Sequence, residues 1–147
     1  MISDPVILAL QQQVDCYRRL SKLAEIQHEH VQQSRIEDLL DVLGRRQQVL
    51  DRVAELEQTI GPAKRCWGEY VSGLEGPGRA QAEDLLAESR RLLELITLSD
   101  RQDTMVLQMR KVHLGKQITQ ASAAKQINRT YAAAAYGPRS SKMDLQR

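Results

Sequence analysis

The sequence contains no phenylalanine and one tryptophan, and aromatic residues make up only 3% of it. Aromatic and β-branched residues favour strands, whereas leucine, glutamine, glutamate, arginine and alanine lose little rotamer freedom in a helix. The 147 residues include 19 leucines and 16 glutamines. The composition therefore predicts an all-α chain, and the length suits one domain with its own core.

Cysteine and long apolar runs are also scarce. Cys16 and Cys66 are single and far apart, so the sequence has neither a zinc-ligand set nor the disulfide framework of a secreted protein. No run approaches the roughly 20 apolar residues of a membrane span, and no basic leader accompanies the short apolar stretch within residues 1–10. We expect a cytoplasmic protein with no signal peptide and no stable membrane insertion.

Catalytic motifs are missing as well. The sequence has no Walker A loop and no G-x-G-x-x-G, and Cys16, Cys66 and His113 have no spacing typical of a Cys–His pair. His28 and His30 would lie about 200° apart on a helix, so we expect surface side chains that do not share a metal ion. We expect no enzymatic activity, no metal site and no cofactor.

Proline, glycine and capping residues indicate where the helices in the first half of the chain begin and end. Asp4, directly before a proline, is a favoured N-cap. The tetrapeptide "SRIE" predicts a capping box between Ser34 and Glu37 that opens a second helix, and Gly61-Pro62 predicts its end. An antiparallel hairpin with a tight turn at 32–34 is expected, although one kinked continuous helix also fits. The predicted helices span residues 4–32 and 34–60.

A long uninterrupted stretch occupies the second half. A short, weak helix is predicted over 63–74, and "EGPG" marks a break after it. The next 50 residues contain no proline, which predicts a helix over 79–128 that is about 75 Å long, against about 45 and 40 Å for the first two helices. We expect a single all-helical domain over 1–128, an antiparallel hairpin or coiled-coil bundle with one very long C-terminal helix. A flexible basic tail is expected over 129–147.

Apolar side chains on the long predicted helix form two stripes at about 100° per residue. One is the predicted core seam, and the other lies on roughly the opposite side. Methionine suits surfaces that must accept more than one shape, so the second stripe is either bundle core or a surface for a client helix or a second copy. The seam comprises Ala82, Leu86, Ser89, Leu93, Ile96, Leu107, Leu114, Ile118 and Ala121, and the second stripe comprises Leu98, Met105, Met109 and Val112.

Three charged residues, Asp100, Asp103 and Arg110, interrupt the predicted seam. Two aspartates supply too few oxygen ligands for a metal ion, and no second acidic helix pattern complements them. We expect a paired polar layer that fixes the register of the helices, as single polar positions do in coiled coils.

Charge is unevenly distributed along the chain. Residues 1–104 hold 13 Lys/Arg against 18 Asp/Glu, whereas residues 105–147 hold 8 against one. Basic residues interleaved with Tyr131 and Tyr136 could bind single-stranded nucleic acid by phosphate neutralisation and stacking. The basic residues are scattered, and there are only two tyrosines. A mobile tail that becomes ordered when it docks on a partner is therefore the preferred interpretation.

Three stretches, taken in order, resemble the FlgN-type flagellar export chaperones: "IEDLLDVLGRRQQVLDRVAELEQTI", then "GPGRAQAEDLLAESRRLLELITLSDRQD", and "YAAAAYG" near the end. The resemblance spans nearly the whole chain. It implies a small cytoplasmic all-α chaperone that works without ATP. The Ala-rich, strongly basic ending differs from the enterobacterial members of that family, which leaves the identity of the client open.

The resemblance also implies partners and a site. Such a chaperone binds hook–filament junction (hook-associated) proteins, prevents premature assembly of their terminal helices and delivers them to the type III export gate or export ATPase. The alternative function is that of a structural coiled-coil protein that associates with itself, for example as a homodimer. A nucleic-acid-binding helical protein is a less favoured alternative. The implied client-binding residues are Met105, Leu107, Met109, Val112, Leu114, Ile118, Ala121, Ile127, Tyr131 and Tyr136, to which the second stripe adds Leu98.

Deletion of residues 128–147 tests the role assigned to the tail. We expect the helical content, measured by circular dichroism, to stay nearly unchanged, because most of the predicted helices remain. Binding of the client should weaken, because Tyr131 and Tyr136 are expected to anchor it. Unaltered client affinity in the truncated protein would refute the assignment.

Overall fold

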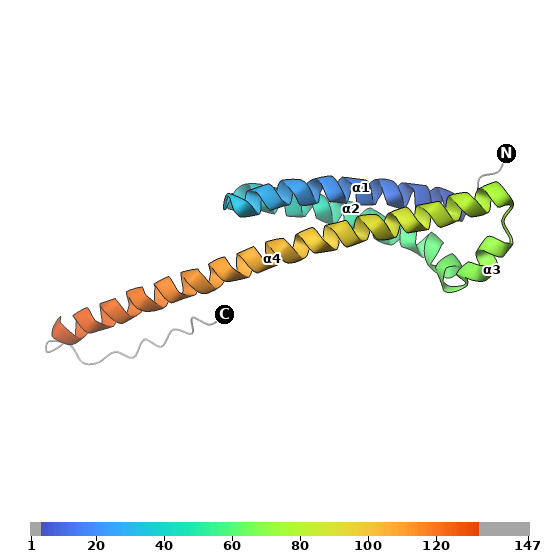
Figure 1. The fold of residues 1–147 in the computed structure, drawn as a ribbon. Helices are drawn as coiled ribbons and strands as arrows, with labels where there is room; N and C mark the ends of the chain where they lie inside the picture. The colour runs from blue at the N-terminus through green and yellow to red at the C-terminus, as the bar shows by residue number, and fades with distance from the viewer. Residues whose placement is uncertain (1–3, 133–147) are drawn as a thin grey trace. The chain divides into compact units, whose positions relative to one another are not determined.

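The computed structural model describes residues 4–132 of the chain, and side chains as far as Ala123. Four helices account for nearly all of this range: α1 (Pro5–Gln32), α2 (Ile36–Arg65), α3 (Trp67–Ser72) and α4 (Gly76–Ala132) (Figure 1). The all-α prediction is confirmed. The chain divides into an N-terminal unit, Met1–Asp103, and a C-terminal unit, Thr104–Arg147, so the boundary falls inside α4 and inside the predicted 1–128 domain.

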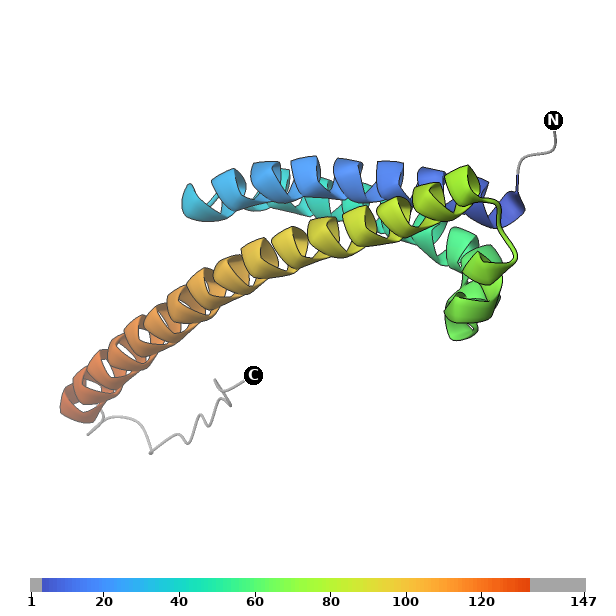
Figure 2. The same cartoon turned by 45° about the vertical axis from the view of Figure 1, so that its right-hand side comes forward.

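Three helices of the N-terminal unit share one repeat. In each, buried or half-buried positions recur at alternating spacings of three and four residues, the 3.5-residue period of a coiled coil. α2 packs antiparallel to α1 and to the first half of α4, and these three segments run side by side (Figure 2). The repeat comprises residues 10, 13, 17, 20, 24, 27 and 31 of α1, residues 39, 42, 46, 49, 53, 56 and 60 of α2, and residues 82, 85, 89, 92, 96, 99 and 103 of α4.

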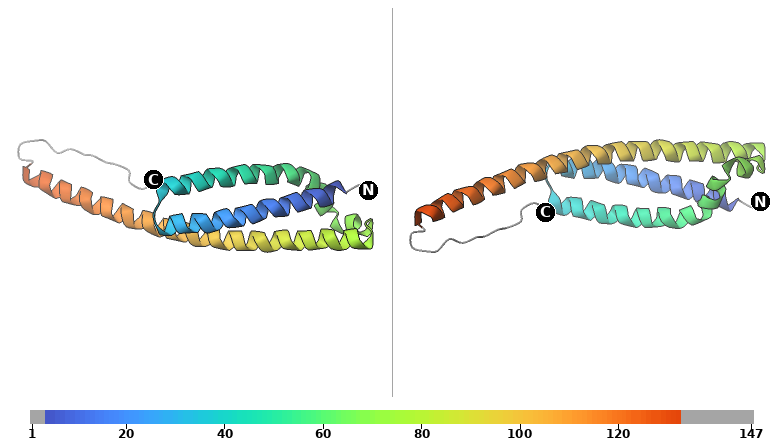
Figure 3. Two further views of the ribbon diagram at one scale, coloured as in Figure 1. Left: turned by 90° about the horizontal axis from the view of Figure 1, so that it is seen from above. Right: turned by 90° about the horizontal axis from the view of Figure 1, so that it is seen from below.

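α1 buries more residues than α2, ten against four. The two opposite views in Figure 3 show it, in projection, between α2 and the first half of α4. α2 and α4 also contact each other, since Arg46 of α2 donates to Asp100 of α4 at 2.7 Å. Each helix of this three-helix bundle therefore has two neighbours.

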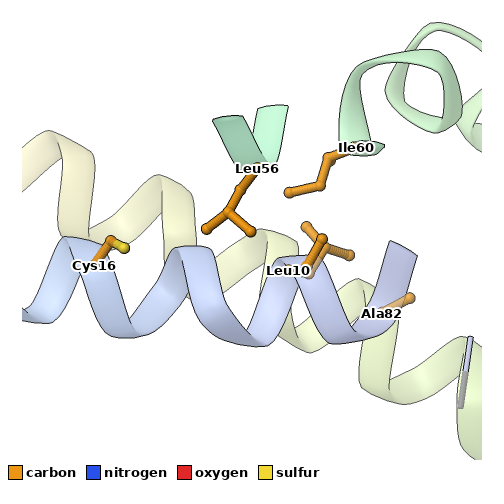
Figure 4. Packing of buried hydrophobic residues seen from close by; sticks show 6 residues of the cluster. Leu10, Cys16, Leu56, Ile60 and Ala82 are labelled. Atoms are coloured by element: carbon orange, nitrogen blue, oxygen red, sulfur yellow. The ribbon is translucent and has the colours of Figure 1, made fainter. Parts of the chain in front are cut away.

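The core consists of two apolar clusters stacked along the bundle. In the first, Leu10, Leu56, Ile60 and Ala82 bring all three helices together, with Cys16 beside them (Figure 4). Burying one leucine or isoleucine side chain stabilises the fold by about 1.5–3 kcal/mol, so this layer contributes strongly. The second cluster comprises Val14, Tyr17, Leu20, Leu92 and Ile96.

The turn between α1 and α2 combines one correct prediction with one wrong one. The tight turn forms, and it excludes the kinked continuous helix. The capping box does not form, because Ser34 has a φ of 56°, the left-handed conformation that follows a helix C-terminus, and an N-cap requires an extended backbone. The N–H of Arg35 donates to the carbonyl of His30 at 2.9 Å, which closes α1 with a Schellman-type bond. Arg35 itself precedes α2 without a side-chain cap.

Helix boundaries near proline differ from prediction in both directions. The predicted N-cap is confirmed, since Asp4 Oδ1 accepts from the backbone N–H of Val6 at 2.8 Å. α2 continues through Pro62 to Arg65. Proline has no backbone N–H, so the helix loses one backbone hydrogen bond at Pro62, close to its C-terminal end. α4 begins at Gly76, because proline at position 77 lies in a first turn whose N–H groups have no intrahelical partner.

The predicted core seam of α4 is only partly correct. Ala82, Leu86, Ser89 and Ile96 are buried as expected, but Leu93 is 40% exposed and Leu92 is buried in its place. An ideal helix drifts by about 20° per heptad from a 3.5-residue repeat, and the helices follow the repeat. The seam also ends at Asp103: its predicted continuation, Leu107, Leu114, Ile118 and Ala121, is exposed.

α3 is tied to the start of α1 through one side chain. The hydroxyl of Tyr70 donates to Asp4 Oδ1 at 3.0 Å, and the ring lies 5.4 Å from that of Trp67. Burial, and then the hydrogen bond to Asp4, raises the pKa of Tyr70 above its ordinary value. Within residues 4–132, no helix combines the length and hydrophobicity needed to cross a membrane.

Substitution of Leu10 by alanine tests the packing of the first core cluster. We expect Leu10→Ala to lower the free energy of unfolding by about 2–5 kcal/mol, because a fully buried side chain leaves a cavity among three helices. Leu40→Ala on exposed α2 surface is the matched control and should change it by less than about 0.5 kcal/mol. Chemical denaturation followed by circular dichroism measures both, and equal effects would contradict the packing.

Candidate functional site

The C-terminal unit carries exposed apolar side chains along α4. Met105, Met109 and Val112 (the Met face) are 64%, 70% and 58% exposed. Leu107, Leu114 and Ile118 (the Leu face) are 38%, 56% and 41% exposed. Apolar side chains that recur at such helical spacings are the contacts through which an amphipathic helix meets another helix. The interpretation of the second stripe as bundle core is therefore wrong for the Met face.

The remaining predicted client-binding residues stand as follows. Ala121 is exposed on α4. Leu98 is 56% exposed but belongs to the N-terminal unit. The backbone of Ile127 and Tyr131 belongs to α4, but their side chains lie outside the described part of the structure. Tyr136 lies entirely outside it, as do all residues 133–147 of the predicted tail.

The surroundings of the Met face are open and basic. Met105, Met109 and Val112, together with His113 and Lys116, line a shallow depression that is open to solvent. Such a surface suits contact with another macromolecule better than enclosure of a small molecule. Between Thr104 and Ala123 the sequence has three basic residues, Arg110, Lys111 and Lys116, and no acidic one. The exposed apolar surface is therefore accompanied by positive charge alone.

A polar cluster closes one end of the N-terminal unit. Nη1 and Nη2 of Arg46 donate to Oδ1 and Oδ2 of Asp100, each at 2.7 Å, and Nη1 also donates to Gln27 Oε1 at 2.7 Å. The amide of Gln27 donates to Asp103 Oδ2 at 2.9 Å, and His28 Nδ1 lies 2.7 Å from Asp103 Oδ1. Three helices are thus joined by hydrogen bonds between side chains.

Sequence reasoning found only half of this cluster. The expected polar layer at Asp100 and Asp103 is present, but His28, predicted as a surface residue, is half-buried and contacts Asp103. His30 is half-buried too, so both histidines lie only partly at the surface. One signal for Gln27 and Arg46 was available in the sequence: they occupy positions of the coiled-coil repeat that are mostly apolar.

The electrostatics of the cluster are those of a satisfied ion pair. The hydrogen bond to Asp100 raises the pKa of Arg46 above its already high ordinary value, against the opposing effect of burial. Asp103 is only 1% exposed and has partners on both carboxylate oxygens. Since Arg46 and Gln27 already donate to these carboxylates, the cluster is a structural joint between helices.

Other reactive side chains do not assemble into a site. Cys16 is buried, and desolvation raises the pKa of its thiol, which keeps it protonated and unreactive. Cys66 is exposed on its own. The described residues contain no group of three or more His, Cys, Asp or Glu side chains arranged to hold a metal ion.

Comparison with known proteins gives no independent assignment. No protein-family model, no curated protein and no solved structure matches the chain.

Replacement of Arg46 by methionine tests the polar cluster. Arg46→Met keeps the aliphatic stem but removes the cation from two neighbouring carboxylates, so we expect a loss of about 2–3 kcal/mol in the free energy of unfolding. The adjacent Arg45→Met is the matched control, because Arg45 is exposed and pairs only with Asp41 on the surface; its effect should stay below about 1 kcal/mol. Urea denaturation compares the two, and similar losses would disprove the special role of Arg46.

Proposed function

We propose that this protein is a cytoplasmic export chaperone of the FlgN type. It binds helical ends of hook–filament junction proteins, prevents their premature assembly and delivers them to the flagellar type III export machinery. It acts by binding alone, as a non-enzymatic protein without nucleotide or metal. The observation that carries the proposal is the exposed apolar surface on α4 beyond Asp103, from Met105 to Ile118.

Exposed apolar surface of this kind supports a binding function on physical grounds. Soluble proteins rarely leave large contiguous apolar patches in water, and such patches mark interaction sites. The exposed residues lie on a helix, so their natural complement is a second helix with apolar residues at i, i+3 or i+4, and i+7. Terminal helices that must stay unassembled until secretion are partners of this type.

The sequence resemblance narrows the class of partner. It covers the α2 stretch, the first half of α4 and the final "YAAAAYG" motif in their order along the chain. The same resemblance assigns client binding to the C-terminal part, where the exposed Met and Leu faces lie. These are two separate lines of support, one from family likeness and one from exposure.

Self-association is the competing function, because the same apolar residues could meet a second copy. Residues 104–123 contain three basic and no acidic side chains, so pairing this segment with itself brings like charges together. Like charges oppose such pairing, whereas a different partner can supply opposite charge. Charge therefore favours a client over a second copy.

A binding measurement with purified components tests the proposal. We expect the full-length chain to form a stoichiometric complex with a hook–filament junction protein at moderate salt, detected by isothermal titration calorimetry and size-exclusion chromatography. The control is the same junction protein without its terminal helical segments, which should not bind. Equal binding of the truncated client, or self-association of the chain with no client complex, would reject the proposal.

A further inference from the structure

The Met face and the Leu face lie on opposite sides of α4. At about 100° per residue, Met105, Met109 and Val112 fall within about 60° of one another on the helix surface. The members of the Leu face fall within about 40°, and the centres of the two faces are about 170° apart by the same rule. Residues 104–123 therefore present apolar side chains in two opposite directions.

One partner helix cannot cover both faces. Packed helices interlock along a stripe roughly 100° wide, with their axes about 8–10 Å apart. A helix seated on Met109 therefore leaves Leu114 in water, and a helix seated on Leu114 leaves Met109 in water. Neither face is covered in the structure, since Met109 is 70% and Leu114 56% exposed. Covering both requires two helices.

The N-terminal unit already contains a helix packed in this way. The buried residues of α1, from Ala9 to Val31, spread over about 160° of its surface at about 100° per residue, because α2 and α4 cover it from two sides. A helix that contacts two neighbours is thus part of how this chain builds a core. The two faces of residues 104–123 lie farther apart than the contacts on α1, so each face needs a neighbour of its own.

Charge specifies the chemistry of the missing neighbours. By the same rotation, Lys111 lies at one edge of the Leu face, and Lys116 continues the Met face one turn beyond Val112. Carboxylates at the edges of a packed helix pair with such side chains, as charged residues beside the seam of a coiled coil do. A second copy of this segment offers only more positive charge, so it does not meet this requirement.

We infer that the client contributes two acidic helices, one packed on the Met face and one on the Leu face of residues 104–123, with Asp and Glu side chains opposite Lys111 and Lys116. The inference rests on the proposed function, since the client supplies both helices. It adds the number of helices that the site takes and the charge they carry.

Single substitutions on each face test the two-helix arrangement. Binding of a hook–filament junction protein to full-length Met109→Glu and Leu114→Glu is measured by calorimetry. Each variant should bind at least tenfold more weakly than the wild type, because each places a carboxylate in a separate contact. Gln81→Glu, with the same charge change at an exposed position of α4 in the N-terminal unit, should bind like the wild type. Circular dichroism confirms folding, which both exposed sites should tolerate.

The pattern of losses separates the possible failures. Loss of binding in only one face variant would overturn the two-helix arrangement, because one helix would then suffice, yet it would leave the export-chaperone proposal intact. Absence of binding by the wild type would overturn the proposed function itself, and the two-helix arrangement with it. Wild-type binding that neither substitution weakens would show that the client sits elsewhere, which also overturns the inference.

A charge reversal tests the acidic character of the two client helices. Lys111→Glu should weaken client binding about tenfold at an ionic strength of about 0.05 M, and the loss should shrink at about 0.5 M, where exposed charges are screened. Lys22→Glu, an exposed reversal on α1, is the control and should have little effect. Stronger binding by Lys111→Glu, or a loss that does not depend on salt, would overturn the assignment of an acidic partner.

Discussion

Seven successive positions in each of α1, α2 and α4 recur at alternating spacings of three and four residues, and the bundle depends on this shared repeat. The repeat keeps one strip of each helix facing its neighbours over about six turns, which an uncorrected 3.6-residue helix would not do. On α4 it ends at Asp103. The next positions in the same register are Val106, Arg110, His113 and Gln117, of which only the valine is apolar, so the apolar seam does not continue. This change of composition explains why the boundary between the two units falls inside an unbroken helix.

The polar cluster at that end adds specificity to the packing. Burying charged groups costs free energy that is recovered only when every group is paired with good geometry. Arg46 meets Asp100 through two bonds while Gln27 bridges both to Asp103, so one alignment of the three helices satisfies the whole set. A shift of one heptad would leave Asp103 buried without its partners. The apolar layers at Leu10 and Leu20 stabilise the bundle but would tolerate such a shift more readily, because leucine packs acceptably against many apolar neighbours.

α4 combines two kinds of surface in one helix. Up to Asp103 it has the single buried strip of a bundle member, and from Met105 onward it has two opposite apolar faces in a purely basic setting. Under the proposed function, a chaperone without nucleotide would obtain its binding energy and its selectivity from such a surface alone. Methionine adapts its shape and leucine packs regularly, so the two faces suit different contacts, while the positive charge discriminates against a second copy of the same segment.

Composition and spacing determined much of this protein. The lack of aromatic residues and the abundance of leucine and glutamine predict helices, Asp4 predicts the first N-cap, and Asp100 with Asp103 predicts a polar layer. The opposite placement of the Met residues and the Leu residues on α4 also follows from spacing alone, because local backbone geometry sets it. Only the tertiary structure decided that Leu92 is buried and Leu93 is not, that His28 contacts Asp103, and that Leu107 and Leu114 are exposed. The physical reason is that burial depends on which neighbour a side chain meets, and contacts between Gln27, Arg46 and Asp100, far apart in the chain, are set by the packing of three helices together.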